Sequence, residues 1–268
     1  MDMSGDELLL SVLCAVGAII LWVRWYVPLR DVGRPGRRSR AHVAIAAAPL
    51  LCAVVVLVVL MLWSSFDVRD DLRYLFMYGA MGATWLAASV RVQSYLGLSA
   101  RDDVVERRNL SAGVAVSGAL VGTTLCFSGA NIGDGPGWLV VVLAAALSTG
   151  GLMLAWLVLE WLTGISETIT VERDLAAGIR LAGLLVALGL ILGRAVAGDF
   201  TTVDRMLADF RDGIWLVPVL LAVATAFERL ARPTPAAPQA PPVALGVLPA
   251  LIYLTAALAY VSHAGMPA

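Results

Sequence analysis

The sequence predicts an all-α integral membrane protein of about eight transmembrane helices, built from tandem two-helix repeats of about 65 residues. Hydrophobic residues make up 60% of the 268 residues and charged residues only 15%, which leaves too little polar surface to cover a soluble globule. Apolar runs of roughly 20 residues, the length that crosses a bilayer, recur along the whole chain. Two charged stretches, "SARDDVVERRNLSAG" and "SETITVERDLAAG", resemble each other and indicate the repeat.

Eight apolar runs are the expected membrane helices, because each is a continuous block and a helix satisfies its own backbone in lipid. They are Leu8–Val27, Val43–Trp63, Leu72–Val90, Leu110–Ala130, Trp138–Leu159, Leu175–Ala197, Ile214–Ala231 and Val243–Val261. The first run is long and follows the acidic start "MDMSGDE", which favours a retained helix over a cleaved signal peptide. The connections are too short for a soluble domain, so we expect one polytopic membrane domain over residues 1–268.

The arginines predict the orientation of the chain, since the sequence contains no lysine. Six arginines lie between Arg24 and Arg40, four between Arg91 and Arg108, and four more near the later connections on the same side. The other side has five of the total of 19. Positively charged loops stay in the cytoplasm, so we expect a bacterial plasma (inner) membrane protein with both termini outside the cytoplasm.

The two charged stretches align as copies of one unit when Asn109 is placed on Asp174. The alignment matches Leu110 with Leu175, Ala112 with Ala177, Gly113 with Gly178 and Gly118 with Gly183. Extending the same step in both directions predicts four units, at approximately 7–65, 71–131, 137–198 and 212–263. The outer two share only hydropathy and spacing with the central two.

Each central unit should contain a helix cap followed by a packing face. Asn109 and Asp174 can each cap the helix that returns from the linker, because their side chains accept hydrogen bonds from its first amides. Gly113, Gly118, Gly178 and Gly183 follow on those helices and would let helix backbones approach closely in lipid.

At these residues the chain resembles a bacterial inner-membrane family known as domain of unknown function 350 (DUF350). "LTGISETI" followed by "VERDLAAGIRLAG" carries the resemblance, and "YLGLSARDDVVERRNLSAGVAVSG" is a second, slightly stretched copy. The resemblance covers residues 72 to 197. It implies stacked two-helix units in a multi-pass plasma-membrane protein and a loose link to envelope stress, and it supplies no catalytic residues.

Motifs of known chemistry are not found in the sequence. It contains no Walker loop, HExxH or CxxC motif, and His42 and His263 fall on opposite expected faces of the membrane. We therefore expect no enzyme activity, no cofactor and no metal. Four arginines could bind anionic lipid headgroups or could simply determine topology. They are Arg34, Arg37, Arg38 and Arg40.

Ionisable residues recur near the linker ends of the odd-numbered runs. Arg24, Arg91, Glu160 and Glu228 are spaced by 67, 69 and 68 residues, and Arg180 lies just inside the sixth run. Because a charge inside a bilayer is costly unless it is paired, we expect intramembrane pairs. Glu228 would meet Arg24 or Arg180, and Glu160 would meet Arg91 or a neighbour.

Two functions remain open from the sequence. The first is a membrane scaffold or partner-binding subunit, whose partners are the lipid bilayer and a cytoplasmic protein or a second copy of the chain, with no nucleic acid. The second is a channel or transporter-like conduit for ions or small solutes, with the charged residues at its entrance.

Overall fold

The computed structural model describes residues 3–31, 40–135, 137–199, 202–232 and 240–265. Its long helices are α1 (Gly5–Asp31), α2 (Arg40–Trp63), α4 (Leu72–Tyr95), α5 (Leu110–Gly129), α6 (Trp138–Thr163), α8 (Leu175–Ala195), α10 (Leu216–Leu230) and α11 (Leu248–Ala264). Shorter elements are α3 (Phe66–Arg69), α7 (Ile165–Thr170), α9 (Val203–Gly213) and two π-helical turns, η1 (Ala100–Glu106) and η2 (Val243–Val247). The protein is an all-α, multi-pass membrane protein, as the sequence predicts.

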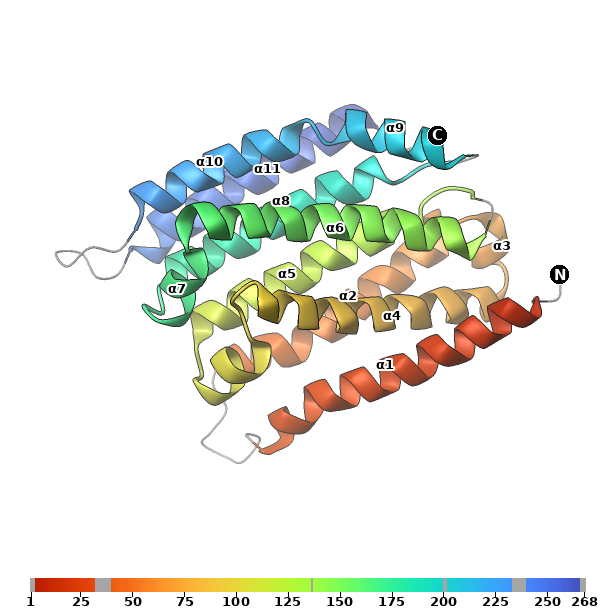
Figure 1. Cartoon of the computed structure of the whole chain (residues 1–268), viewed down its shortest axis with the longest axis horizontal. Coiled ribbons are helices and arrows are strands. Elements are labelled where there is room, and N and C mark those ends of the chain that lie inside the picture. The colour runs from red at the N-terminus through yellow and green to blue at the C-terminus, as the bar shows by residue number, and fades with distance from the viewer. Residues whose placement is uncertain (1–2, 32–39, 136, 200–201, 233–239, 266–268) are drawn as a thin grey trace.

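Seven helical segments of the described chain are long and apolar enough to cross a membrane. Helix α4 is absent from this group although it has 24 residues, because Arg73, Arg91 and several weakly apolar residues lower its hydropathy. It still runs alongside the others (Figure 1). The seventh predicted run differs most, since an amphipathic helix, α9, precedes α10 and joins it in one segment, Val203–Leu230.

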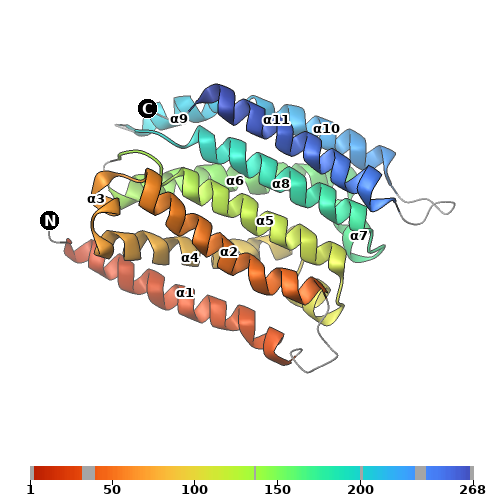
Figure 2. The same cartoon turned by 180° about the vertical axis from the view of Figure 1, so that it is seen from behind.

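The long helices form two layers. In one layer α1, α4, α6 and α10 lie side by side (Figure 1), and in the other α2, α5, α8 and α11 form a row (Figure 2). Successive long helices run in opposite directions, so helices of the same layer are parallel. The described ends of the chain lie at one end of the bundle with α3 and α9, which we call the terminal end; η1 and α7 lie at the other, the linker end (Figures 1 and 2).

Glycines close the second layer by backbone contact. A Cβ added at Gly118 would clash with the Cα of Ala182 in α8, and one at Gly183 would clash with Ala250 in α11. Gly178 faces the backbone of Ser111 in α5 in the same way, while Gly113 faces Ala41 of α2. Lipid provides no hydrophobic drive between helices, so this close approach supplies dispersion contacts that larger residues would prevent.

Aromatic side chains mark the two boundaries of the apolar band. At the linker end Tyr95 is 89% exposed and Trp161 83% exposed, and at the terminal end Trp63 and Trp215 are also exposed. Tyrosine and tryptophan concentrate at membrane interfaces, where one edge of the ring is wet. Along α6, Trp138 and Trp161 stand about 35 Å apart at 1.5 Å per residue, which matches a bilayer core with its interfaces.

Contacts between neighbouring helix pairs join residues about one unit apart. At the linker end the Ser111 hydroxyl donates to the carbonyl of Asp174 at 2.6 Å, and at the terminal end the Gly198 amide donates to the carbonyl of Ile132 at 3.0 Å. The separations are 63 and 66 residues. Stacked units of about 65 residues would produce this spacing, but the division of the chain into four repeats stays a prediction.

Candidate functional site

The most deeply buried ion pair among the described residues lies between α8 and α10. Arg180 is 1% exposed and Glu228 is 7% exposed. The guanidinium donates from Nε to Oε1 of Glu228 at 2.6 Å and from Nη2 to Oε2 at 2.7 Å, so the contact is bidentate. Two parallel charge-assisted hydrogen bonds fix the geometry of both side chains.

The surrounding backbone completes the coordination of Arg180. Its Nη1 donates to the carbonyl of Leu245, which lies in the π-helical turn η2. Turns of this kind are common at functional sites, because they depart from the regular α-helical hydrogen-bond ladder. Three nitrogens of Arg180 therefore have acceptors, and the pair links α8, α10 and the start of the last membrane segment. Charge neutralisation of this kind is what lowers the cost of placing ions in the bilayer.

Two buried polar groups, which belong to one hydrophobic cluster, have no hydrogen-bond partner among the described residues. They are the hydroxyl of Tyr253 in α11 and the indole Nε1 of Trp156 in α6, whose residues are 0% and 1% exposed. The Tyr253 ring packs edge-on against Phe227, the residue before Glu228, with ring centroids 6.2 Å apart. The Tyr253 hydroxyl, which has no hydrogen-bond partner, thus belongs to a ring that packs close to the ion pair. No pattern in the sequence identified this residue.

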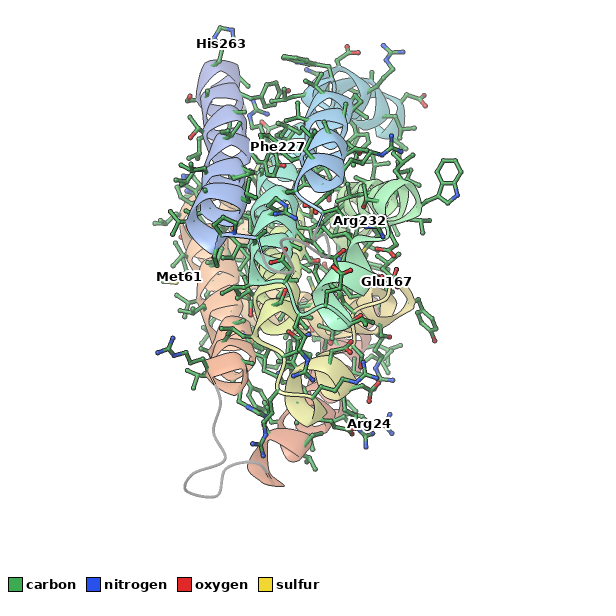
Figure 3. All side chains as sticks on the ribbon, turned by 90° about the vertical axis from the view of Figure 1, so that its left-hand side faces the viewer. Arg24, Met61, Glu167, Phe227, Arg232 and His263 are labelled. Carbon is green, nitrogen blue, oxygen red and sulfur yellow. The ribbon has the colours of Figure 1, made fainter. Side chains whose placement is uncertain are left out.

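The other expected intramembrane pairs are not formed by described residues. Glu160 was expected to form an ion pair with Arg91 or a neighbour, but its carboxylate accepts from the backbone amide of Ser166 at 2.9 Å and from its hydroxyl at 2.6 Å. The expectation was wrong because α6 ends at Gly164 in a left-handed conformation, which turns the chain back and brings α7 onto Glu160. Arg24 and Arg91 are both exposed and have no ion pair with a described carboxylate. Figure 3 shows Arg24 pointing away from the bundle.

The two central linkers fold in the same way. Asn109 is the N-cap of α5 and accepts from the amide of Ala112, and Asp174 is the N-cap of α8 and accepts from Ala176 and Ala177. The residue before each cap is an arginine with positive φ, 53° at Arg108 and 57° at Arg173. The Asn109 side chain also donates to the carbonyl of Ile169 at 2.7 Å, which ties the first linker to the second. The 65-residue alignment places the two arginines on each other, and that was the only sequence signal for their shared conformation.

Three hydroxyl groups along α5 bond within their own helix. Ser117 donates to the carbonyl of Gly113, Thr123 to Ala119 and Thr124 to Leu120, each four residues earlier in the same helix. Serine and threonine in membrane helices commonly satisfy themselves in this way. Two other hydroxyls of this helix differ, since Ser111 donates to the carbonyl of Asp174 and the buried hydroxyl of Ser128 has no partner among the described residues.

Exposed charges also lie at the linker end. Arg232 lies 4.0 Å from Glu167, and both side chains are more than half exposed (Figure 3). Of the four expected headgroup contacts, Arg40 is the exposed first residue of α2. The others, Arg34, Arg37 and Arg38, lie outside the described residues.

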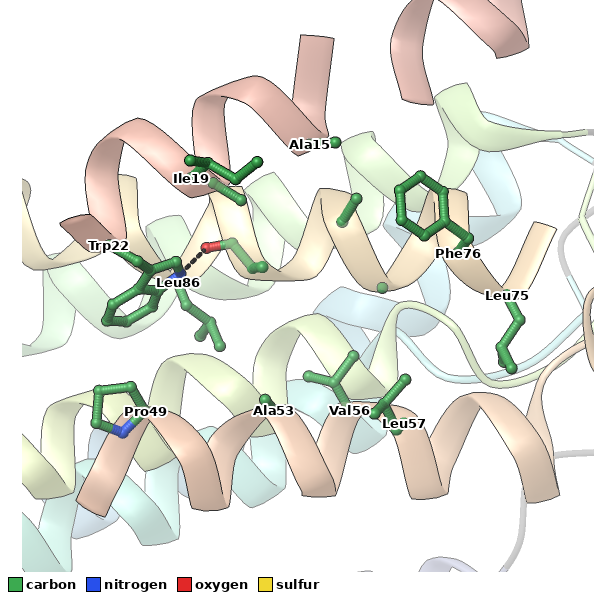
Figure 4. A pocket seen from close by; sticks show the side chains of 14 residues that line it. Ala15, Ile19, Trp22, Pro49, Ala53, Val56, Leu57, Leu75, Phe76 and Leu86 are labelled. Atoms are coloured by element: carbon green, nitrogen blue, oxygen red, sulfur yellow. Dashed lines mark hydrogen bonds between the residues drawn. The ribbon is translucent and has the colours of Figure 1, made fainter. Parts of the chain in front are cut away.

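An apolar groove of about 420 Å³ lies between α1 and α2, with α4 as its floor. Only apolar side chains and small residues line it, and the indole of Trp22 crosses it to donate to the carbonyl of Ala83 at 2.9 Å (Figure 4). The groove contains no unsatisfied polar group among its lining residues that could select a polar ligand. The lining of the groove is suited to binding a hydrocarbon chain.

One comparison with known proteins bears on this architecture. Residues 133–263 match the family model described as "Domain of Unknown Function (DUF350)". Through these residues, the chain belongs to the DUF350 family. The match lies closer to the C-terminus than residues 72 to 197, where the sequence resemblance placed it, and it contains α6, α8, α10 and α11.

The DUF350 match includes both members of the buried ion pair, Arg180 and Glu228, and the second linker with its cap. The exposed arginines Arg24 and Arg91 lie outside it. No curated protein and no solved structure matches the chain.

Proposed function

We propose that this DUF350 protein is a membrane scaffold, a partner-binding subunit whose linker end docks a cytoplasmic protein or a second copy of the chain. The proposal rests on the close packing of the interior. Glycines in α5 and α8 bring the two backbones into contact, three of the α5 hydroxyls bond to their own helix, and Arg180 and Glu228 neutralise each other. A bundle packed in this way is not expected to conduct solutes. The proposal is non-enzymatic and involves no nucleic acid.

The orientation is part of the same proposal. The arginine bias places the linker end in the cytoplasm of a bacterial inner membrane and both termini outside. Arg101, Arg107 and Arg173 are then exposed toward the cytoplasm together with acidic neighbours, a mixed charged surface of the kind that steers protein partners. The link to envelope stress that the family resemblance implies belongs to this docking role.

A photo-crosslinking residue at Glu172 tests the docking surface in cells. Glu172 is exposed in the second linker, so it should give a discrete crosslinked product, whereas the same residue at Gly135, exposed at the terminal end, should not. Equal crosslinking at both sites, or none at Glu172, would contradict docking at the linker end.

A conduit for ions or small solutes is the second candidate, and the buried ion pair favours it. Ionisable residues within a membrane span often mark ion or proton pathways, and Tyr253 adds an unpartnered hydroxyl near the pair. Ion flux through purified protein in liposomes separates the two functions. The scaffold predicts no flux above empty liposomes. Reproducible flux that disappears in a folded Glu228→Gln variant would establish the conduit instead.

A further inference from the structure

Two arginines of the N-terminal half that form no ion pair with a described carboxylate, Arg24 and Arg91, lie at the same level on neighbouring helices. Gly17 of α1 lies against Thr84 of α4, where an added Cβ would be 3.4 Å from the threonine methyl. Both helices run from the terminal end toward the linker end. Arg24 and Arg91 each come seven residues after this contact, so both are about 10 Å further along, two turns closer to the linker end.

The two arginines differ from the charged residues at the corresponding positions of the C-terminal half. At the corresponding positions of the C-terminal half the charge is negative and is satisfied internally, Glu160 by Ser166 and Glu228 by Arg180. Arg24 and Arg91 are exposed and form no ion pair with a described carboxylate. Two like charges on adjacent helices repel each other, so an external anion that lies between or beside them would stabilise this arrangement.

The position of the arginines in the membrane identifies the anion. Tyr95 follows Arg91 by one helical turn and is 89% exposed, as expected for a ring at the membrane boundary. Arg91 therefore lies just inside that boundary, where its long side chain reaches the phosphate layer. Further from the linker end, the same two helices border the apolar groove at Trp22 and Leu86 (Figure 4). The arginines thus lie at the membrane boundary and the apolar groove lies deeper in the membrane. A phospholipid has the same arrangement, with a charged headgroup at the boundary and hydrocarbon tails further in.

We propose that Arg24 and Arg91 together bind the headgroup phosphate of an acidic phospholipid at the linker-end boundary of α1 and α4. Arginine suits this ligand because its fork of N–H donors matches phosphate oxygens and its charge persists at the membrane surface. The site belongs to the half of the chain outside the DUF350 match.

Titration of phosphatidylglycerol into the purified full chain in neutral detergent, followed by native mass spectrometry, tests the site. Each arginine near an anionic headgroup contributes about 1 kcal/mol, so the variant Arg24→Gln/Arg91→Gln should bind this lipid roughly thirty-fold more weakly than the parent. Phosphatidylcholine should bind both proteins equally weakly. The variant Arg24→Lys/Arg91→Lys keeps the charge but lacks the fork of donors, so its affinity should lie between those of the parent and the glutamine variant, which separates loss of the site from misfolding.

The matched control is Arg229→Gln/Arg232→Gln, which removes the same charge from exposed arginines at the same end of the bundle. It should bind phosphatidylglycerol as the parent does. Equal loss in both glutamine variants would show a general charge effect and overturn the site, and so would parental affinity in Arg24→Gln/Arg91→Gln. Displacement of the lipid by millimolar inorganic phosphate would overturn the assignment to a lipid headgroup and indicate a free anion.

Discussion

Replacing Glu228 by glutamine should destabilise the folded bundle strongly. The substitution keeps the size of the side chain and removes its charge, which leaves Arg180, 1% exposed, without a counter-ion. Breaking a buried pair in this way costs about 3–5 kcal/mol, because the surviving charge remains desolvated. The carbonyl of Leu245 still accepts from Arg180, which places the expected loss nearer the lower value.

The matched control is Glu167→Gln, which removes the partner of Arg232 from an exposed ion pair. The atoms are 4.0 Å apart and the side chains are 54% and 67% exposed, so this pair is worth about 1 kcal/mol or less. Unfolding of each variant by SDS in mixed micelles, followed by tryptophan fluorescence and circular dichroism, measures both losses. The double variant Glu228→Gln/Arg180→Gln should recover part of the loss, since it removes the uncompensated charge.

The cycle of single and double variants gives the coupling energy directly. A loss for Glu228→Gln no larger than that for Glu167→Gln would refute the burial argument, because it would show that water reaches the pair. A full loss with no coupling to Arg180 would refute the pairing itself.

Further expectations follow from the packing, the topology and the linkers. Gly118→Ile should cost about 1–3 kcal/mol or more and lower the folded yield, because its Cβ would clash with Ala182, whereas Gly150→Ile has open space around it and should fold normally by size-exclusion chromatography. In a variant without native cysteines, a cysteine at Gly135 should react with an impermeant thiol reagent on intact cells and one at Ser99 should not; the reverse pattern would overturn the orientation. Arg173→Gly should stabilise the protein by about 1 kcal/mol, because an arginine at φ 57° is strained and glycine is not, and a lower unfolding midpoint would contradict this.

The candidate site was only partly predictable from the sequence. The pairing of Glu228 with Arg180 was one of two partners that charge and spacing allowed. Glu160 was assigned to the wrong kind of partner, since its bond to Ser166 depends on a left-handed turn at Gly164 that periodicity does not reveal. The neighbouring positions of Arg24 and Arg91 were also hidden, because spacing in the chain does not say which helices of the same direction become neighbours.

The sequence by itself determined the class and the helices of this protein. Hydrocarbon requires continuous apolar runs with internally bonded backbone, so composition and run length were enough to predict an all-α membrane protein, and Asn109 and Asp174 mark helix starts through local hydrogen bonds. Only the tertiary structure decided that the long helices form two parallel layers, that α5 and α8 meet through their glycines, and that Arg180 turns inward while Arg24 and Arg91 remain outside. The reason is physical: local bonds and transfer to lipid act within each helix, whereas close packing and charge pairing depend on which faces of separate helices come together.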